Sequence, residues 1–334
     1  MGARVAIIFN ADCPSRYRSL GEEQAVLGVL EAVRAVGGAL SALGYPVRQV
    51  PLAPPLEEVE ATLRRLETDV VFNLFEGFSG NPETEAEVAD MMSALGLAYT
   101  GCPGAALRLS LDKAGSKKLL QANGIRTPVF QVLSEGSVSG FNLGFPCIVK
   151  PQGEDASHGI SSESVVDSPA GLRGQVARVS RHYGGTALVE EFLDGREFNA
   201  TVLGNSEMLA LPVSEVEYAL PSGAPRILTY SAKWQPDSRY FGGTVPSCPA
   251  HVTEEEREDI GALAIRACRM LGCQGYARVD MRTDAGGNLN VLEVNPNPDV
   301  SPGSGAARQA AAAGMTYAGL IDRITRLALG RDAA

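Results

Sequence analysis

Two carboxylates and one amide fall on adjacent predicted strands near the C-terminal end of the sequence. Asp280 lies in the apolar segment 275–282, and Glu293 and Asn295 lie in the segment 288–295. The letters TDAGG between these segments are typical of a hairpin turn, so Asp280 is expected roughly opposite Glu293. Side chains two residues apart on a strand project to the same face, which brings Asn295 to the same place.

Oxygen ligands of this kind suit a hard cation such as Mg²⁺. Magnesium typically takes one or two carboxylates and leaves its other positions to water and phosphate oxygens. A solvated polar sheet face is the competing interpretation. However, Val279, Val291, Leu292 and Val294 indicate a buried hairpin, where unpaired acids would be costly. The sequence therefore favours a metal site.

Cationic side chains occur at two further places that could bind anions. Lys150 ends the apolar strand 145–150 and precedes the polar loop PQGEDASHGISS at 151–162. A lysine there can reach a phosphate while loop N–H groups approach it, although an ordinary surface lysine is the alternative. Lys113 lies on the predicted helix 111–123 and is interpreted in the same way.

Arg278 precedes Asp280 by two residues and is expected on the same sheet face. A cation beside a metal site can stabilise developing negative charge. A structural ion pair with Asp280 or Glu293 remains an alternative.

The acidic stretch VEEFLDGREF, at 189–198, could hold the amine and hydroxyl groups of a nucleoside. Its acids end a predicted strand and are followed by a turn at Asp194 and Gly195. An ordinary acidic hairpin is the competing interpretation.

Strands and helices alternate through the first hundred residues, which predicts a doubly wound parallel sheet. The expected strands are 5–9, 47–50 and 70–74, and the expected helices are 22–43, 56–66 and 83–95. The later half is predicted as α+β, because its strands follow one another as a meander. Its expected strands are 186–192, 197–203 and 208–213, and its expected helices are 168–182, 253–271, 304–313 and 316–330.

The segment 214–252 has few periodic signals and contains the only tryptophan, Trp234. A segment of this length without regular structure is usually functional or disordered.

Composition excludes several classes of function. The formal charge is 29 minus 39, or −10, which argues against binding to nucleic acid or anionic membranes. No apolar run approaches the roughly 20 residues of a membrane helix. The six cysteines form no CxxC pair and no zinc spacing, so they are interpreted as free thiols of a cytoplasmic protein.

Five motifs in order resemble the D-alanine–D-alanine ligases of the ATP-grasp superfamily, over roughly residues 1–330. They are YTGCPGAALRLSLDKAGSKKLLQANGIRTP, FPCIVKP, LVEEFLDGREFNATVLG, GYARVDM and LEVNPNP. The resemblance implies a three-domain ATP-grasp fold with ATP between the second and third domains. The domains expected are 1–103, 104–186 and 187–334, with an active-site lid within about 214–252.

The resemblance also implies roles for individual residues toward ATP. Lys113, Lys150 and Lys233 would contact its phosphates, Ser157 would belong to the phosphate loop, and Glu197 would bind the ribose. Glu190, Phe192 and Leu193 would line the adenine pocket, and Glu191 would contribute its backbone. Asp280, Glu293 and Asn295 would bind two Mg²⁺ ions, or Mn²⁺ in their place.

The implied reaction activates a carboxylate as an acyl phosphate, which an amine then attacks to form an amide. Arg278, Lys233 and Ser304 would act on the reacting groups. The partners expected are a small carboxylic acid and a small amine, and the family implies a homodimer. A closed lid would keep water from the acyl phosphate.

The positions that face the amino-acid substrates depart from those ligases. Glu76 stands where they have a histidine, Trp234 where they have a lid tyrosine, and Ser304-Gly305 where they have serine and leucine. Glu22 or Glu23 would take the place of the glutamate that holds the first amino group. The phosphate-loop serine that helps hold the substrate is Ala156 here.

Three hypotheses follow. The first is an ATP-dependent carboxylate–amine ligase with a substrate other than D-alanine, for which Glu76 suggests a positively charged group. The second is an authentic D-alanine–D-alanine ligase, and the third is a non-catalytic ATP-binding regulatory protein.

Overall fold

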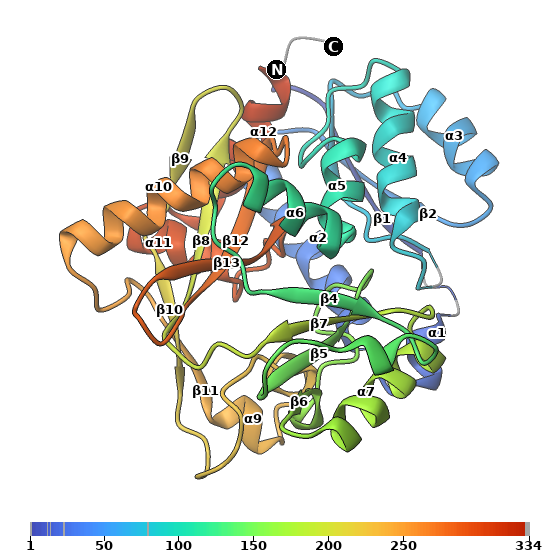
Figure 1. The fold of residues 1–334 in the computed structure, drawn as a ribbon. Helices are drawn as coiled ribbons and strands as arrows, with labels where there is room; N and C mark the ends of the chain where they lie inside the picture. Colours follow the sequence, from blue (N-terminus) through green and yellow to red (C-terminus); the bar gives the residue numbers. More distant parts are fainter. Residues whose placement is uncertain (1, 12, 14, 23, 79, 331–334) are drawn as a thin grey trace.

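The computed structural model describes the chain except residues 1, 12, 14, 23, 79 and 331–334 (Figure 1). Three sheets divide it: a parallel sheet at the N-terminus, a four-stranded antiparallel sheet in the middle and a larger antiparallel sheet toward the C-terminus. This arrangement confirms the predicted fold class, α/β with an α+β C-terminal half. Among the described residues, no helix has the length and apolarity needed to cross a membrane.

The N-terminal sheet has the strand order β2-β1-β3, with all pairings parallel. Its side chains alternate, so Ile7 and Phe9 pack toward α2 while Ala6 and Ile8 pack toward α3 and α4. Helices therefore cover both faces, as the sequence predicts. The elements are β1 (Val5–Asn10), α1 (Arg16–Ser19), α2 (Gln24–Ala42), β2 (Val47–Leu52), α3 (Leu56–Arg64), β3 (Val70–Leu74) and α4 (Glu83–Ala94).

The second unit carries the four-stranded sheet β4-β7-β5-β6. The predicted helix 111–123 is confirmed as one helix that begins at Lys113, because Asp112 caps it: the Asp112 carboxylate accepts the Gly115 N–H at 3.0 Å. A separate helix that the sequence did not predict precedes it and ends at Leu111. The elements are α5 (Gly104–Leu111), α6 (Lys113–Ala122), β4 (Phe130–Leu133), β5 (Cys147–Pro151), β6 (Val165–Val166), α7 (Pro169–His182) and β7 (Ala187–Glu191), with 3₁₀ turns at Val138–Gly140 and Ser162–Ser164.

The third unit carries the sheet β11-β10-β8-β12-β13, with β9 beside β8. Helix α10 begins at a capping box, in which Thr253 and Glu256 satisfy each other's backbone N–H groups. The elements are β8 (Glu197–Gly204), β9 (Met208–Ala210), β10 (Ser214–Tyr218), α8 (Tyr230–Trp234), α9 (Arg239–Gly242), β11 (Thr244–Ser247), α10 (Glu254–Met270), β12 (Gly275–Thr283), β13 (Leu289–Pro296), α11 (Gly305–Ala312) and α12 (Tyr317–Leu329).

The segment 214–252 is more regular than its sequence suggests. It contains β10, α8, α9 and β11. Both helices are shorter than two turns, and each starts at a hydroxyl cap, Thr229 or Ser238. Elements this short leave no periodic pattern of the kind that reveals longer helices.

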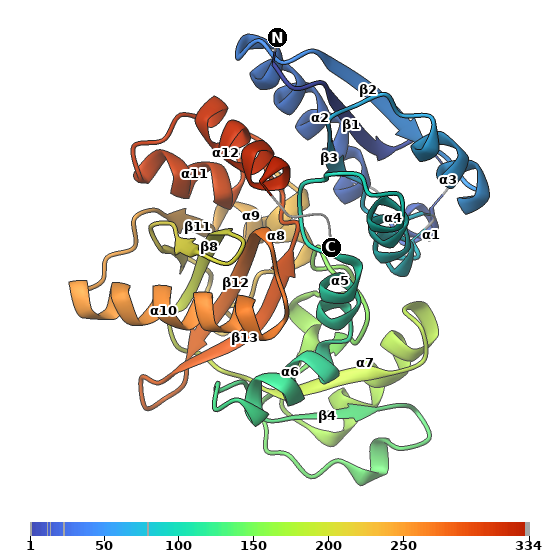
Figure 2. The ribbon, with the colours of Figure 1, turned by 90° about the horizontal axis from the view of Figure 1, so that it is seen from above.

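The first and third units share one hydrophobic core. Helix α12 packs beside α2 (Figure 2). Ile324 and Leu320 of α12 belong to one buried cluster with Val36 and Leu40 of α2. The boundary expected at residues 186 and 187 remains a prediction. Because β7 pairs with β4 and β5, the sheets favour a boundary after Glu191.

Candidate active site

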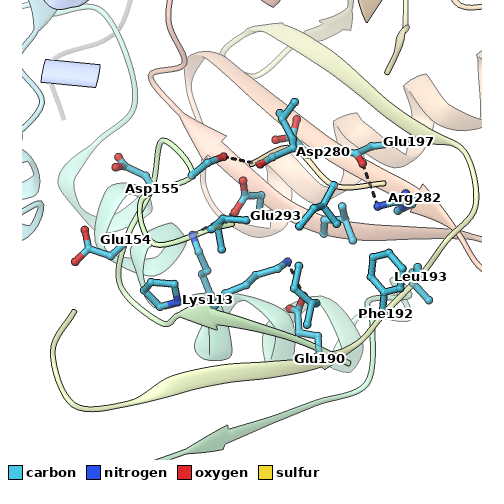
Figure 3. Close-up of a pocket in the computed structure, with 18 of the residues that line it drawn as sticks. Lys113, Glu154, Asp155, Glu190, Phe192, Leu193, Glu197, Asp280, Arg282 and Glu293 are labelled. Atoms are coloured by element: carbon cyan, nitrogen blue, oxygen red, sulfur yellow. Dashed lines mark hydrogen bonds and ion pairs between the residues drawn. The ribbon is translucent and has the colours of Figure 1, made fainter. Parts of the chain in front are cut away.

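A cleft of about 830 Å³, including the part open to solvent, lies between the second and third sheets (Figure 3). Its walls carry most of the residues that the sequence predicts for ATP. They include Lys113, Lys150, Ser157, Glu190, Glu191, Phe192, Leu193, Glu197, Lys233, Asp280 and Glu293.

The predicted hairpin register is confirmed, since Asp280 of β12 pairs directly with Glu293 of β13. The guanidinium of Arg278 donates two hydrogen bonds to the Asp280 carboxylate, at 2.7 and 2.8 Å. Asn295 pairs with Arg278 in the register, and its amide donates to Asp280 at 3.0 Å. Arg278 therefore makes the ion pair with Asp280 that the sequence left as an alternative.

Glu293 is surrounded by cations. Lys113 Nζ lies 3.2 Å from its carboxylate, and Figure 3 shows the two side chains meeting in the cleft. Burial would raise the pKa of Glu293, but Lys113, Lys150 and Lys233 outweigh it and hold the pKa well below its usual range. Glu293 is thus ionised across the physiological range and available as an oxygen ligand.

Glu190 anchors two lysines at the base of the cleft. Its carboxylate lies 2.7 Å from Lys117 Nζ and 2.7 Å from Lys150 Nζ. Glu190 and Lys117 are 1% and 2% exposed. Burial opposes ionisation of Glu190, yet the charges of Lys117 and Lys150 lower its pKa. Glu190 thus lies where adenine is predicted to bind. It also orients Lys150, which is predicted to contact the phosphates.

Lys117 is a site residue that sequence reasoning missed. Besides Glu190, its ammonium donates to the Thr127 hydroxyl at 2.8 Å and to the Leu292 carbonyl at 2.9 Å, which ties α6 to β13. Its position four residues after Lys113 on one helix face was the available signal. Nothing in the sequence marked it as buried.

Lys233 reaches the cleft from α8. Within the described chain its ammonium has no hydrogen bond or ion pair. Burial lowers its pKa, and the nearby charge of Arg278 lowers it further, although Asp280 and Glu293 act in the opposite direction. A buried ammonium group in these surroundings would be stabilised strongly by a nearby anion such as a phosphate.

Glu197 is held at the far end of the cleft by two partners. Tyr218 donates its hydroxyl hydrogen to the carboxylate at 2.7 Å, and an Arg282 nitrogen lies 3.2 Å away. Burial raises the pKa of Glu197, while Arg282 and Tyr218 act against this. Arg282 also stacks over Phe192, at 5.5 Å from the ring centre. Sequence reasoning missed Arg282, although the alternation 278, 280, 282 along β12 points to it.

The phosphate loop is held in shape by left-handed backbone and by contacts with the lid. Ala156 and Ser157 have φ angles of 47° and 61°. The Ser157 hydroxyl donates to the Leu228 carbonyl at 3.1 Å, and the Trp234 indole donates to the Ala156 carbonyl at 3.1 Å. Leu228 and Trp234 belong to the expected lid, within about 214–252, so the structure has the lid docked on the loop. Trp234 also lies against Gly28 of α2.

Glu22 binds the same loop. Its carboxylate lies 2.8 Å from His158 Nδ1, accepts the Gly159 N–H at 3.1 Å and accepts the Tyr183 hydroxyl at 3.0 Å. Its carboxylate oxygens are therefore engaged by the protein, which favours a structural role over the expected contact with a substrate amino group. Glu23 lies outside the described residues.

Glu76 follows β3 and is solvent-accessible. The surrounding protein raises its pKa well above the usual value, and the acids Asp155, Glu85 and Asp299 add to this shift. Burial likewise raises the pKa of Glu85 to about 8. Acids that repel one another in this way favour a cationic group among them, as the sequence suggested.

Ser304 and Gly305 lie at the start of α11. Ser304 is the N-cap, and its hydroxyl accepts the Ala307 N–H at 3.2 Å. A capping serine still has its hydroxyl hydrogen to donate.

The donor chemistry of the hairpin fits a divalent cation. Two carboxylates and one amide meet beside a cleft lined with lysines, a set that Mg²⁺ would complete with water and phosphate oxygens. No group of three His, Cys, Asp or Glu side chains with metal-binding geometry occurs in the part of the chain that the structure describes, so protein carboxylates alone form no closed cage.

Comparison with known proteins identifies a family and relatives that this chain resembles. Residues 119–326 match the family described as D-ala D-ala ligase C-terminus. A D-alanine–D-alanine ligase of Desulforudis audaxviator is 31% identical over 308 residues, covering 90% of this chain and 94% of the relative. An uncharacterised protein, y4sG, of Sinorhizobium fredii is 37% identical over 264 residues, covering 78% and 74%.

Solved structures agree on the fold. The ATP complex of a D-alanine–D-alanine ligase from Bacillus anthracis superposes with a TM-score of 0.74 at 21% identity, over 98% of both chains. The VanG D-Ala:D-Ser ligase from Enterococcus faecalis gives 0.76 at 20% identity, over 98% and 100%.

The fold and the family match together define an ATP-dependent ligase that joins a carboxylate to an amine. The chain belongs to the D-alanine–D-alanine ligase family.

Proposed function

We propose that this ligase acts on a substrate other than D-alanine, while activating its carboxylate with ATP as the family does. The observation that carries the proposal is a contrast within one site. The cleft keeps the lysines and acids expected for ATP, whereas Glu76, Trp234 and Gly305 replace the substrate-facing residues of the related ligases.

The residues of the cleft suggest how the reaction proceeds. Lys113, Lys150 and Lys233 would hold the triphosphate so that a substrate carboxylate oxygen can attack the γ-phosphorus, displacing ADP. Mg²⁺ held by Asp280, Glu293 and Asn295 would neutralise phosphate charge. Positioning and charge neutralisation are the main tasks of this step.

The second step forms the amide. The amine nitrogen attacks the acyl carbon, the C–O bond to phosphate breaks, and the nitrogen loses a proton. Arg278 would stabilise the negative charge on the tetrahedral oxygen. The lid contacts of Ser157 and Trp234 would exclude water, which otherwise hydrolyses the acyl phosphate.

The test is ADP release by the purified protein with Mg²⁺-ATP and pairs of acids and amines. The proposal expects release that needs both partners, with an amide product detected by mass spectrometry. A screen of amino acids and small acids that never raises ADP above background would overturn it.

An authentic D-alanine–D-alanine ligase is the second candidate, because relatives carrying that name align over about nine-tenths of this chain. An assay with millimolar D-alanine as the only amino acid distinguishes the two candidate functions. Efficient formation of D-alanyl-D-alanine would replace the first proposal.

A further inference from the structure

Arg308 differs from Arg278 and Arg282 in its surroundings. Arg278 is matched by Asp280 and Arg282 by Glu197, whereas Arg308 has no carboxylate within ion-pair distance among the described residues. One of its terminal nitrogens donates to the Gly303 carbonyl. Its Nε is buried and has no hydrogen-bond partner within the part of the chain that the structure describes. A half-buried guanidinium with an unsatisfied donor is costly unless an acceptor reaches it.

The charges around Arg308 point to an anion. Burial lowers its pKa; Cys248 and Asp299 counteract this, and the positive charge of Arg278 adds to the lowering. Two nitrogens of Arg278 already donate hydrogen bonds to the Asp280 carboxylate. Two guanidinium groups that repel each other across the start of α11 would be stabilised by an acidic group between them.

Gly305 leaves this guanidinium uncovered. A Cβ atom built at residue 305 would lie 3.7 Å from Asn199 Oδ1 and 4.0 Å from an Arg308 terminal nitrogen. The side chain of any larger residue would therefore extend toward Arg308 and Asn199. The related ligases have leucine at this position, so the sequence replaces an apolar side chain with space beside a guanidinium and an amide oxygen.

We propose that Arg308, uncovered by Gly305, recognises an acidic side chain of the amine substrate. This inference rests on the proposed function, since it assigns the amine-binding end of the same site. The amine substrate is then an amino acid with two acidic groups: its main carboxylate lies beside Arg278 and Ser304, and its side-chain carboxylate lies beside Arg308. The positive group suggested by Glu76 belongs to the other end of the site.

The experiment compares isosteric amines that differ in one charge: aspartate with asparagine and glutamate with glutamine, each as both enantiomers. The carboxylic acid substrate is the one identified in the ADP-release screen. With it, kcat/KM for aspartate or glutamate as the amine is expected to exceed kcat/KM for asparagine or glutamine by about tenfold or more, the effect of one charge-assisted hydrogen bond. Arg308→Gln should abolish this preference and Arg308→Lys should keep part of it.

Gly305→Leu provides an independent variant, because it fills the opening and leaves the arginine in place. It should lower the kcat/KM preference for the acidic amines over their amides. Arg257→Gln, an exposed arginine on α10 that pairs with Glu254, is the matched control and should change nothing. Thermal unfolding of each variant identifies any that fails to fold.

The outcomes separate this inference from the proposed function. An active ligase whose acidic and amide substrates react equally, or whose ratio survives Arg308→Gln, overturns the inference alone. A protein that releases no ADP with any pair overturns the proposed function. In that case calorimetry of aspartate and glutamate against their amides, on protein loaded with Mg²⁺ and a non-hydrolysable ATP analogue, still tests Arg308, and equal affinities reject it.

Discussion

At the scale of single residues, the cleft is organised by acids that hold cations in place. Glu190 fixes Lys117 and Lys150, Asp280 fixes Arg278, and Glu293 contacts Lys113. Each pair keeps a cation oriented before a ligand arrives, which reduces reorganisation during the reaction. Lys233 is the exception, since it enters the cleft with no partner in the described chain.

Glu190→Gln should destabilise the protein by about 3–5 kcal/mol, because it leaves two buried or half-buried lysines without their counter-charge. It should also raise the KM for ATP, since Lys150 is no longer oriented. Urea unfolding and ATP titration measure both effects. The control is Glu191→Gln, whose carboxylate accepts the exposed Val129 N–H, and equal losses in the two variants would contradict the assignment.

The same residue gives a pH signature. The pKa of Glu190 is lowered in the folded protein, so its stabilisation is present above the unfolded pKa of about 4.3 and is lost as the pH falls through the folded value. Wild-type stability should therefore fall more steeply than that of Glu190→Gln when unfolding is followed below about pH 4.3. If the stabilities of the wild type and Glu190→Gln fall in parallel as the pH is lowered, Glu190 does not contribute to the pH dependence of stability.

Arg278→Lys should lower turnover by about 10²–10³-fold while leaving the affinity for an ATP analogue nearly unchanged. A lysine keeps the charge but loses the planar fork that binds Asp280, and loss of one oxyanion donor typically has this effect on rate. Steady-state ADP release and calorimetry separate the two quantities. An equal loss in analogue binding would instead assign Arg278 to nucleotide binding.

At the scale of elements, the phosphate loop is a meeting point of three units. Glu22 of the first unit, β5 and α7 of the second, and the lid of the third all contact it. The geometry depends on Gly159, whose φ is +74° and whose added Cβ would lie 2.7 Å from Pro151 Cγ and 3.0 Å from the Tyr183 ring. Gly153 in the same loop has open space around it.

Gly159→Ala should therefore raise the KM for ATP and loosen the lid, whereas Gly153→Ala should behave as wild type. Trp234 fluorescence gives an independent readout, because its indole hydrogen-bonds to the loop. The interpretation fails if both alanine variants bind ATP equally well.

The sequence predicted some parts of this site and not others, for physical reasons. The opposition of Asp280 and Glu293 follows from period-two alternation about a recognisable turn, and the structure confirms it. Lys117 escaped, and Glu22 was predicted as a substrate contact and not as a partner of His158, because the partners of both residues are distant in sequence and only tertiary packing brings them together. The short helices α8 and α9 escaped because four or five residues show no period.

At the scale of the whole molecule, the shared core links the two ends of the chain. Residues of β1 and α2 pack against Tyr276 of β12 and against α12. The first unit therefore buries the apolar face of α2 fully only when α12 is in place.

Ile324→Ala should cost about 2–5 kcal/mol, because the side chain is 1% exposed and leaves a cavity in this core. Hydrogen exchange should show that β1 amides lose protection together with those of β12. Leu329→Ala, 39% exposed on the same helix, should cost far less. If β1 protection survives Ile324→Ala, the two ends are not one cooperative unit.

The position of α12 has a consequence for synthesis. The ribosome makes β1 and α2 before α12, and more than 270 residues separate Ala42 from Tyr317. The apolar face of α2 that packs against α12 therefore stays uncovered while those residues are translated. Fragments that stop before residue 317 should keep that face exposed and depend on chaperones.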